Sequence, residues 1–221
     1  TFGVFAQVFD SEGASVHTPQ SINTTTMGGQ VYPVAAYLTY GETKGYAVAY
    51  EDQQFPNSGQ VNRIMVRLTD AMGVGQGEPF FVSAEGVSAT QPSIASIPNQ
   101  PDVLIGAAID NQRIGLFYVN PIDQNVRYRS GSMGRQDVQV SVTRHSQIDT
   151  FVYLAGVNDE ARYVLAQHSL DDEPTETRTI LEGHLPPYQT AFALSDGRAA
   201  AAVTERIDRT SLVIRVHVFG Y

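Results

Sequence analysis

Apolar residues in this chain occur in short bursts of four to seven, separated by segments rich in Gly, Pro, Asn, Asp and Ser. The bursts are rich in Val, Ile, Tyr, Phe and Thr, which is the local pattern of β-strands. No window of twelve residues follows a helical period, in which apolar positions recur every three or four residues. The pattern therefore predicts an all-β protein.

Five of the predicted strands resemble one another and recur about every 47 to 60 residues along the chain. They are Gly3–Asp10, Arg63–Asp70, Gly115–Asn120, Arg162–His168 and Leu212–Phe219. A recurrence of this length is typical of a repeat architecture. Each of the first four is followed by three further strands in a constant order: a polar strand, a strand of small residues and a strongly apolar strand.

These three strand types complete a four-stranded repeat. The polar strands are centred on Ile22, Val82, Tyr128 and Ile180; the small-residue strands are Pro33–Ala36, Pro92–Ala95, Val138–Val142 and Thr190–Leu194; the most apolar strands are Tyr46–Tyr50, Val103–Ile109, Phe151–Gly156 and Ala199–Val203. Alanine is a poor strand former, yet it is concentrated in the last two types. Small side chains are needed where backbones converge, as they do around the axis of a β-propeller.

Four antiparallel strands in about 45–50 residues match one propeller blade. In blade order the small-residue strand is A, the apolar strand B, the recurring strand C and the polar strand D. We expect an all-β fold, a β-propeller of about four four-stranded blades, with five blades as the alternative. A β-sandwich is the main competing architecture at this length.

The expected organisation is a single propeller-like domain over residues 1–221. Its repeats cover about 1–59, 60–113, 114–161 and 162–211, and residues 212–221 form a closing or spare strand. There are five C strands but only four of each other type, so one apolar C strand lacks a place in four blades. An apolar strand with an unpaired edge favours addition to a neighbouring domain or subunit. An incomplete fifth blade and a fragment of a longer propeller array are the alternatives.

Composition narrows the classes of partner and chemistry. The net charge of −9 argues against nucleic acid as the main partner. Because the chain has no cysteine, disulfides, thiol catalysis and thiolate metal sites are all excluded. Its apolar runs are far shorter than the ~18 residues that a membrane-spanning helix needs, so no membrane span is expected.

The first fifty residues carry a more specific pattern. They comprise Gly3–Gly13, Ile22–Thr26, Gly28–Gln30 before Pro33–Ala35, and Gly45–Tyr50. This pattern resembles tandem repeats of very large bacterial secreted and surface proteins of the adhesin-like and haemolysin types. The resemblance is good over residues 1–52 and partial over 61–110, and Tyr50 stands where those repeats usually have Trp. It implies an extracellular, propeller-like module without catalytic residues.

The turn after the first C strand contains a candidate calcium site. Asp10 and Glu12 alternate with small residues and are followed by Gly13. Alternating carboxylates followed by glycine can wrap Ca²⁺, so calcium is the one candidate ion and no other cofactor is expected. Turn chemistry alone also explains Asp and Gly at this place, and it is the interpretation that we favour over a calcium site.

The loops between B and C strands supply the candidate ligand-binding residues. Glu51, Asp52, Asn57 and Asp110 lie in or beside two of these loops. Carboxylates and amides near exposed aromatic residues could hold a sugar or a cation, although a solvated loop explains the same composition. Asn23 begins the sequence Asn-Thr-Thr, which is an acceptor pattern for N-glycosylation.

Glutamines recur just before or at the start of the A strands, at Gln30, Gln91 and Gln189. We interpret them as buried amides that satisfy backbone groups between blades, in preference to ligand-binding residues.

Enzymatic motifs are absent from the sequence. The five histidines are scattered, and no nucleophile elbow, phosphate loop or dinucleotide fingerprint occurs. A propeller glycosidase would need carboxylates at its axial channel, where Asp110, Asp149 and Asp196 are the candidates. The sequence thus favours a non-catalytic extracellular propeller for structural assembly or surface adhesion through protein contacts. A carbohydrate-binding propeller is the alternative, and a glycosidase-like enzyme the third possibility.

Overall fold

The structure is a computed structural model, and it describes residues 3–25, 27–53, 61–97, 100–110, 113–132, 139–144, 150–157, 162–169, 176–182, 190–195, 198–206 and 212–220. These residues form strands and turns and contain no helix, which confirms the all-β prediction. No helix in this part of the chain is therefore long and apolar enough to cross a membrane. The chain divides into two compact units, Thr1–Ile105 with Leu116–Arg129 and Gly106–Gly115 with Ser130–Tyr221, and each is described by itself.

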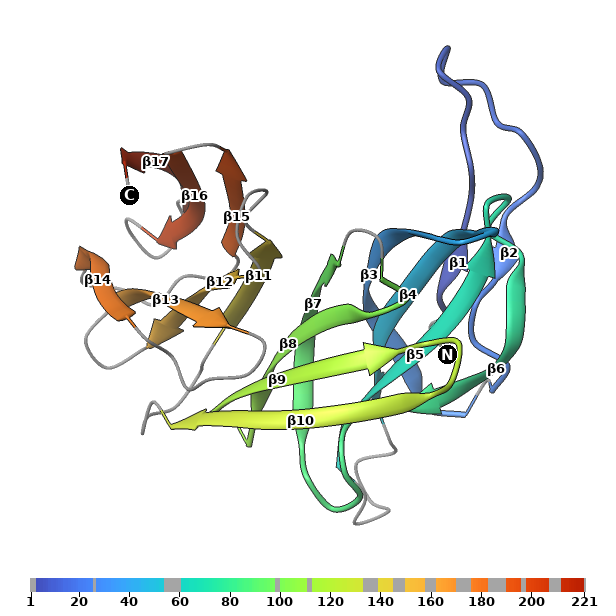
Figure 1. The fold of residues 1–221 in the computed structure, drawn as a ribbon, viewed down its shortest axis with the longest axis horizontal. Coiled ribbons are helices and arrows are strands. Elements are labelled where there is room, and N and C mark those ends of the chain that lie inside the picture. Colours follow the sequence, from blue (N-terminus) through green and yellow to red (C-terminus); the bar gives the residue numbers. More distant parts are fainter. Residues whose placement is uncertain are drawn as a thin grey trace. The chain divides into compact units, whose positions relative to one another are not determined.

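The strands form five antiparallel sheets in which neighbours along the chain are also neighbours in space (Figure 1). Three sheets have four strands: β3 (Gly29–Tyr40), β4 (Thr43–Gln53), β5 (Arg63–Asp70) and β6 (Gly75–Phe81); β7 (Ala89–Ser96), β8 (Val103–Ile109), β9 (Arg113–Asn120) and β10 (Asn125–Ser132); β11 (Gln139–Arg144), β12 (Thr150–Val157), β13 (Arg162–Ser169) and β14 (Glu176–Glu182). A three-stranded sheet contains β15 (Thr190–Ser195), β16 (Arg198–Arg206) and β17 (Leu212–Gly220), and a two-stranded sheet contains β1 (Phe5–Ala6) and β2 (Gln20–Ser21).

Each four-stranded sheet has the predicted A–B–C–D order. The predicted small-residue strands are β3, β7, β11 and β15, each of which begins a sheet and pairs with the apolar strand that follows it. The described strands also reproduce the unequal count, because β1, β5, β9, β13 and β17 are all C strands. The first sheet thus consists of C and D only, and the last sheet of A, B and C only.

The first hairpin is shorter than the sequence predicts. A C strand was expected over Gly3–Asp10, but only Phe5 and Ala6 form ladder pairs, with Ser21 and Gln20. A separate bridge joins Phe9 to Ser15 beside the turn. The expected D strand centred on Ile22 likewise ends at Ser21, although the Ile22 amide still donates to the Val4 carbonyl at 2.9 Å.

Among the residues whose burial is described, those of β8 and β9, the central strands of the sheet β7–β10 (the second complete sheet), are the most deeply buried. All seven residues of β8 are buried, and in β9 every residue except the two at its ends is buried. Both strands read as continuous apolar runs, as strands that are covered on both faces do. This arrangement explains why their sequences show no alternation.

The β1–β2 hairpin packs on one face of the sheet β3–β6. Val4 and Ile22 contact Val48, Tyr50 and Met65 in a buried apolar cluster. Polar contacts add to the cluster, because the Arg67 Nη1 donates to the Ile22 carbonyl at 2.7 Å and the His17 Nε2 lies against the Met72 carbonyl. The hairpin therefore covers the part of this face that β4 and β5 form.

Candidate functional site

The polar residues at the B–C end of the sheet β3–β6 form a buried network around Glu51. The residue is 2% exposed, and its Oε1 accepts hydrogen bonds from Asn62 Nδ2 at 2.9 Å and from Gln53 Nε2 at 3.0 Å. Its Oε2 accepts from the backbone amide of Gln91 at 3.0 Å. Gln91 has a positive φ of 52° and belongs to β7, so this carboxylate joins two sheets.

Asp52 is also buried, at 3% exposure, and belongs to a second chain of contacts. Its Oδ1 accepts from Gln30 Nε2 at 2.9 Å, and the same nitrogen donates to the Met27 carbonyl at 2.8 Å. Gln30 Oε1 in turn accepts from Asn23 Nδ2 at 3.4 Å. Buried polar groups are almost always paired in this way, since an unpaired one costs about 1–3 kcal/mol.

These two networks change the interpretation of the B–C residues. Glu51 and Asp52 were expected to bind a ligand from exposed loops, but their side chains are buried and bonded to amides of neighbouring strands. Asn57 lies outside the described residues. The structural role predicted for Gln30 is confirmed, whereas Gln91 contributes its backbone amide and has an exposed side chain. Gln189 also lies outside the described residues.

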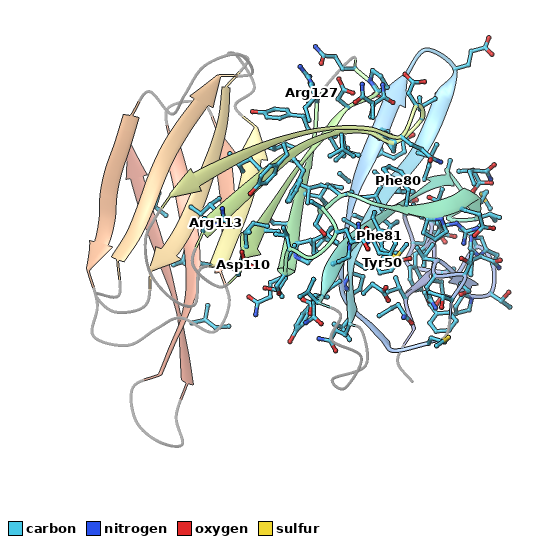
Figure 2. The ribbon with its side chains drawn as sticks, turned by 90° about the horizontal axis from the view of Figure 1, so that it is seen from below. Tyr50, Phe80, Phe81, Asp110, Arg113 and Arg127 are labelled. Atoms are coloured by element: carbon cyan, nitrogen blue, oxygen red, sulfur yellow. The ribbon has the colours of Figure 1, made fainter. Side chains whose placement is uncertain are left out.

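Asp110 is the remaining candidate at a B–C end, and it is accessible. It follows β8 with a positive φ of 51°, and its Oδ2 accepts from Arg113 Nη2 at 2.9 Å (Figure 2). Both side chains are almost half exposed. A surface ion pair of this kind adds little stability. Left-handed backbone at a non-glycine residue is energetically unfavourable, which makes Asp110 a candidate for function.

In the loop predicted to bind calcium, the Asp10 carboxylate is bonded to backbone amides of the same loop. Asp10 Oδ1 accepts from the backbone amides of Glu12 and Ala14, each at 2.9 Å. The turn after β5 repeats this arrangement, because Asp70 Oδ1 accepts from the amides of Met72 and Val74 at 2.9 Å. Turn chemistry therefore accounts for both aspartates, and Glu12 is exposed. In the described part of the chain no three histidine or acidic residues gather as metal ligands do.

Asn23, the predicted glycan acceptor, is buried under the first hairpin. It is 8% exposed, its Oδ1 accepts from the Val4 amide at 2.8 Å, and its Nδ2 donates to the Thr25 carbonyl at 2.6 Å. A glycan on this nitrogen would break the bond to Thr25 and would have no room. The structure thus gives Asn23 an anchoring role.

We expect Asn23→Ala to loosen the N-terminal hairpin and to lower the free energy of unfolding by about 1–2 kcal/mol, because the Val4 amide loses its acceptor. Hydrogen exchange should show faster exchange at Val4 and Ile22. Gln20→Ala is the matched control, since the side-chain amide of Gln20 donates to the nearby Thr18 carbonyl within the same hairpin. Unchanged exchange at Val4 in Asn23→Ala would contradict the anchoring role.

A second acidic residue, which sequence reasoning did not single out, lies at the opposite end of the second complete sheet. Burial raises the pKa of the Asp102 carboxyl, and Arg127 acts against this shift. The Arg127 guanidinium also lies 5.6 Å from the centre of the Tyr118 ring. No sequence motif marks Asp102, because its environment is formed by the strand β10 and the turn that precedes it.

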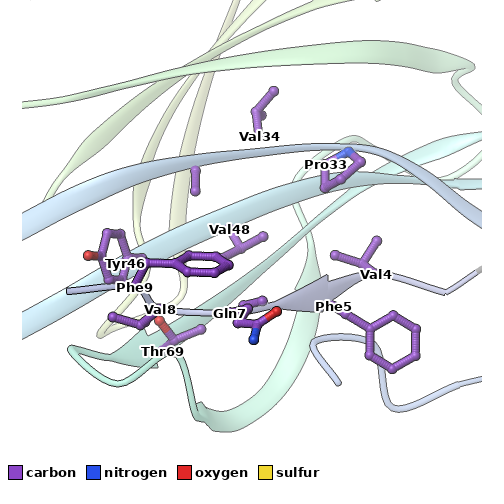
Figure 3. A pocket seen from close by; sticks show the side chains of 13 residues that line it. Val4, Phe5, Gln7, Val8, Phe9, Pro33, Val34, Tyr46, Val48 and Thr69 are labelled. Carbon is purple, nitrogen blue, oxygen red and sulfur yellow. The ribbon is translucent and has the colours of Figure 1, made fainter. Parts of the chain in front are cut away.

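The structure also contains an apolar groove of about 490 Å³ that the sequence did not predict (Figure 3). It lies between the first C strand and the strands β3 and β4. The residues around it are uncharged: Val4, Phe5, Ala6, Gln7, Val8, Phe9, Pro33, Val34, Ala35, Tyr46, Val48, Thr69 and Gly73. The unequal strand count was the only sequence signal that pointed toward it.

Comparison with known proteins indicates the type of fold, through similar solved structures, but assigns the chain to no family. No family model matches this chain. No curated protein matches it either. Among solved structures, it is similar to an α-L-arabinofuranosidase from Fusarium graminearum solved with an iminosugar inhibitor, with a TM-score of 0.63 and 9% identity over 98% of this chain and 70% of that one. It is also similar to a GH43 β-1,3-galactosidase solved with galactodeoxynojirimycin, with a TM-score of 0.55 and 10% identity over 96% of this chain and 76% of that one.

These likenesses support the propeller type of fold and correct the functional interpretation. The chain was expected to be non-catalytic, a module for assembly or adhesion, and not an enzyme. The exclusion of an enzyme is wrong, because the two solved structures named above are glycosidases and a fold of this type can therefore carry catalysis. At 9–10% identity the likeness itself establishes the fold alone. The resemblance to bacterial surface repeats stays a prediction.

Proposed function

We propose that this protein is a β-propeller of the glycosidase type that acts on glycosidic bonds. The support is the likeness of nearly the whole chain to two glycosidases that were both solved with sugar-like inhibitors. The five sheets of the described residues favour five blades, of which the first carries only strands C and D and the last only A, B and C. An extracellular location remains a prediction from the sequence.

Asp110 is the residue that carries this proposal within the chain. Glycoside hydrolysis needs two carboxyl groups, about 5–5.5 Å apart for retention or about 6.5–9.5 Å apart for inversion. We exclude Glu51 and Asp52 because neither is exposed and because amides donate to both oxygens of Glu51 and to Oδ1 of Asp52. Asp110 is exposed and lies where β8 ends, and its carboxylate is oriented by Arg113. The other two predicted carboxylates, Asp149 and Asp196, lie outside the described residues.

The direct test is hydrolysis of chromogenic arabinofuranosides and galactosides by the purified protein. We expect Asp110→Asn to lower kcat/KM by about 100-fold or more, since acid–base catalysis contributes roughly 10²–10⁴. Asp123→Asn is the matched control, because Asp123 lies in the turn at the other end of the same strand β9 and should leave hydrolysis unchanged. An iminosugar should raise the Tm of the unmodified protein.

The outcomes separate the proposal from its alternatives. Activity that survives Asp110→Asn but is lost in Asp149→Asn or Asp196→Asn would keep the function and remove Asp110 from it. Activity lost in Asp102→Asn would place the site at the other end of the sheet β7–β10. Neither hydrolysis nor a Tm shift with any sugar of the panel would contradict the proposed function.

A further inference from the structure

One face of the sheet β3–β6 is covered only over its outer half. On this face β5 and β4 contribute Met65, Val48 and Tyr50, which are buried beneath the first hairpin. The strand β3 contributes Ala35 and Tyr37 to the same face, since they pair with Val48 and Tyr46, and Pro33 lines the groove beside them. These three residues are exposed, and the Tyr37 side chain is 44% exposed. The first hairpin therefore covers the apolar residues of β4 and β5 on this face but leaves those of β3 exposed.

The opposite face of the same strands is covered by another sheet. There β7, the A strand of the next sheet, packs against β3, β4 and β5. Leu38, Ala47 and Ala49 on that face are at most 1% exposed. In this interface the A strand of the next sheet lies against the A, B and C strands of the sheet β3–β6. On the half-covered face the first sheet supplies only its C and D strands among the described residues.

The groove occupies the place where an A and a B strand of the first sheet would lie. It is bounded by Val4–Phe9 on one side and by Pro33–Ala35 with Tyr46 and Val48 on the other (Figure 3). It is continuous with the apolar cluster under the hairpin, because Val4 and Val48 belong to both. No charged residue lines it, so an apolar occupant is favoured over an ionic one.

The first C strand also has an edge that can accept another strand. The carbonyls of Val4 and Val8 are bonded on the β2 side, to the amides of Ile22 and Val16. In an antiparallel pair, alternate residues direct their backbone groups to opposite edges. The amides and carbonyls of Phe5 and Gln7 therefore point to the edge that faces the groove. This is the position at which a B strand pairs in the three complete sheets.

The chain carries a strand suited to this place. β17 is an edge strand of its sheet and pairs with β16 alone among the described strands, in a ladder that runs over Arg198–Arg206. Its Ile214, Val216 and Val218 lie on one face and are 74%, 63% and 66% exposed. A row of exposed apolar residues on an edge strand favours association with another chain.

We propose that this groove is an interface between two copies of the protein, in which β17 of one copy adds to the groove-facing edge of the first C strand of the other. The strand then occupies the B position antiparallel to β1. Its apolar row covers Pro33, Ala35 and Tyr37, and its backbone pairs with Phe5 and Gln7. Reciprocal exchange closes a dimer, whereas one-way exchange produces a chain of copies.

Two substitutions, one on each side of the interface, test this by mass measured in light scattering and sedimentation. Ala35→Glu places a charge in the groove, and Val216→Glu places one on the donor strand. We expect the unmodified protein to associate with rising concentration and each variant to stay monomeric, with association weakened at least tenfold. Ile122→Glu is the matched control, because Ile122 is an exposed apolar residue in the turn before β10 and should not change the mass.

Mixing the two variants gives the sharpest outcome. Ala35→Glu retains an intact β17 and Val216→Glu retains an intact groove, so an equimolar mixture should form a dimer and nothing larger. Phe5→Pro removes the edge amide while Phe5→Ala removes only the side chain, and the proline should weaken association more. Unchanged circular dichroism and Tm establish that each variant is folded.

A monomeric unmodified protein at every concentration would overturn the proposal, as would association that neither charge affects. A mixture that stays monomeric would show that β17 does not occupy the groove. Filling of the groove by a small apolar molecule, seen as a Tm rise without a change of mass, would also overturn it. None of these results depends on glycosidase activity.

Discussion

Replacing Glu51 with alanine is expected to lower the free energy of unfolding by about 3–5 kcal/mol. The carboxylate accepts three hydrogen bonds, from Asn62, Gln53 and the Gln91 amide, in a site that is 2% exposed. Its removal leaves the part-buried Gln91 backbone amide and the side-chain amides of Asn62 and Gln53 without this acceptor. The loss should appear as a lower denaturant midpoint, and in hydrogen exchange as faster exchange at Gln91.

Two control substitutions distinguish the loss of these hydrogen bonds of Glu51 from a general effect of removing a negative charge. Glu42→Ala removes an exposed carboxylate from the turn between β3 and β4 and should change stability little. Glu51→Gln keeps the size and one acceptor, so it should cost less than Glu51→Ala. Equal stability of Glu51→Ala and Glu42→Ala would show that the carboxylate does not hold the two sheets together.

Two substitutions of Tyr50 are expected to change the free energy of unfolding in opposite directions. Its ring is fully buried in the cluster beneath the first hairpin, so Tyr50→Ala should cost about 3–5 kcal/mol. Its hydroxyl has no hydrogen-bond partner among the described residues. Tyr50→Phe removes that unpaired buried group and should stabilise the protein by about 1 kcal/mol. Chemical denaturation near neutral pH measures both changes.

The same hydroxyl makes stability depend on alkaline pH. Burial, with a smaller effect from Asp52, raises the pKa of the Tyr50 hydroxyl well above its ordinary value of 10.0. The folded state then keeps a proton that the unfolded state releases, so stability is present below about pH 10 and falls as the pH rises above it. Tyr50→Phe should lose this component, and the difference between the two proteins should grow with pH. A constant difference across that range would contradict the buried position.

Strand type and order were predictable because they depend on local patterns. The small residues of β3, β7, β11 and β15 and the apolar runs of β4, β8, β12 and β16 predicted each sheet in its A–B–C–D order. Even the fifth C strand could be counted, since a period of about 50 residues is visible without any structure. The chemistry of the Asp10 turn was also readable, because an aspartate bonds backbone amides two and four residues ahead.

Residue environments were much less predictable. Glu51, Asp52 and Asn23 all have the composition of exposed polar loops, yet each is buried by residues 19 to 40 positions away that share its hydrogen bonds. A hydrophilic side chain carries no sign of whether a distant amide will be its partner. Asp110 differs from Asp52 only in its surroundings, and these made one accessible and the other part of the core.

The sequence by itself determined that the chain is all-β, that its strands follow one another in blade order, and that one C strand is surplus, because period and side-chain size act locally. Only the tertiary structure decided where apolar cover ends. Among the described residues the first sheet has a C and a D strand and no A or B strand, and part of the face of β3 is exposed beside it. The groove beside β3 and the burial of Glu51 depend on contacts between segments far apart in the sequence, and such contacts leave no local pattern in the chain.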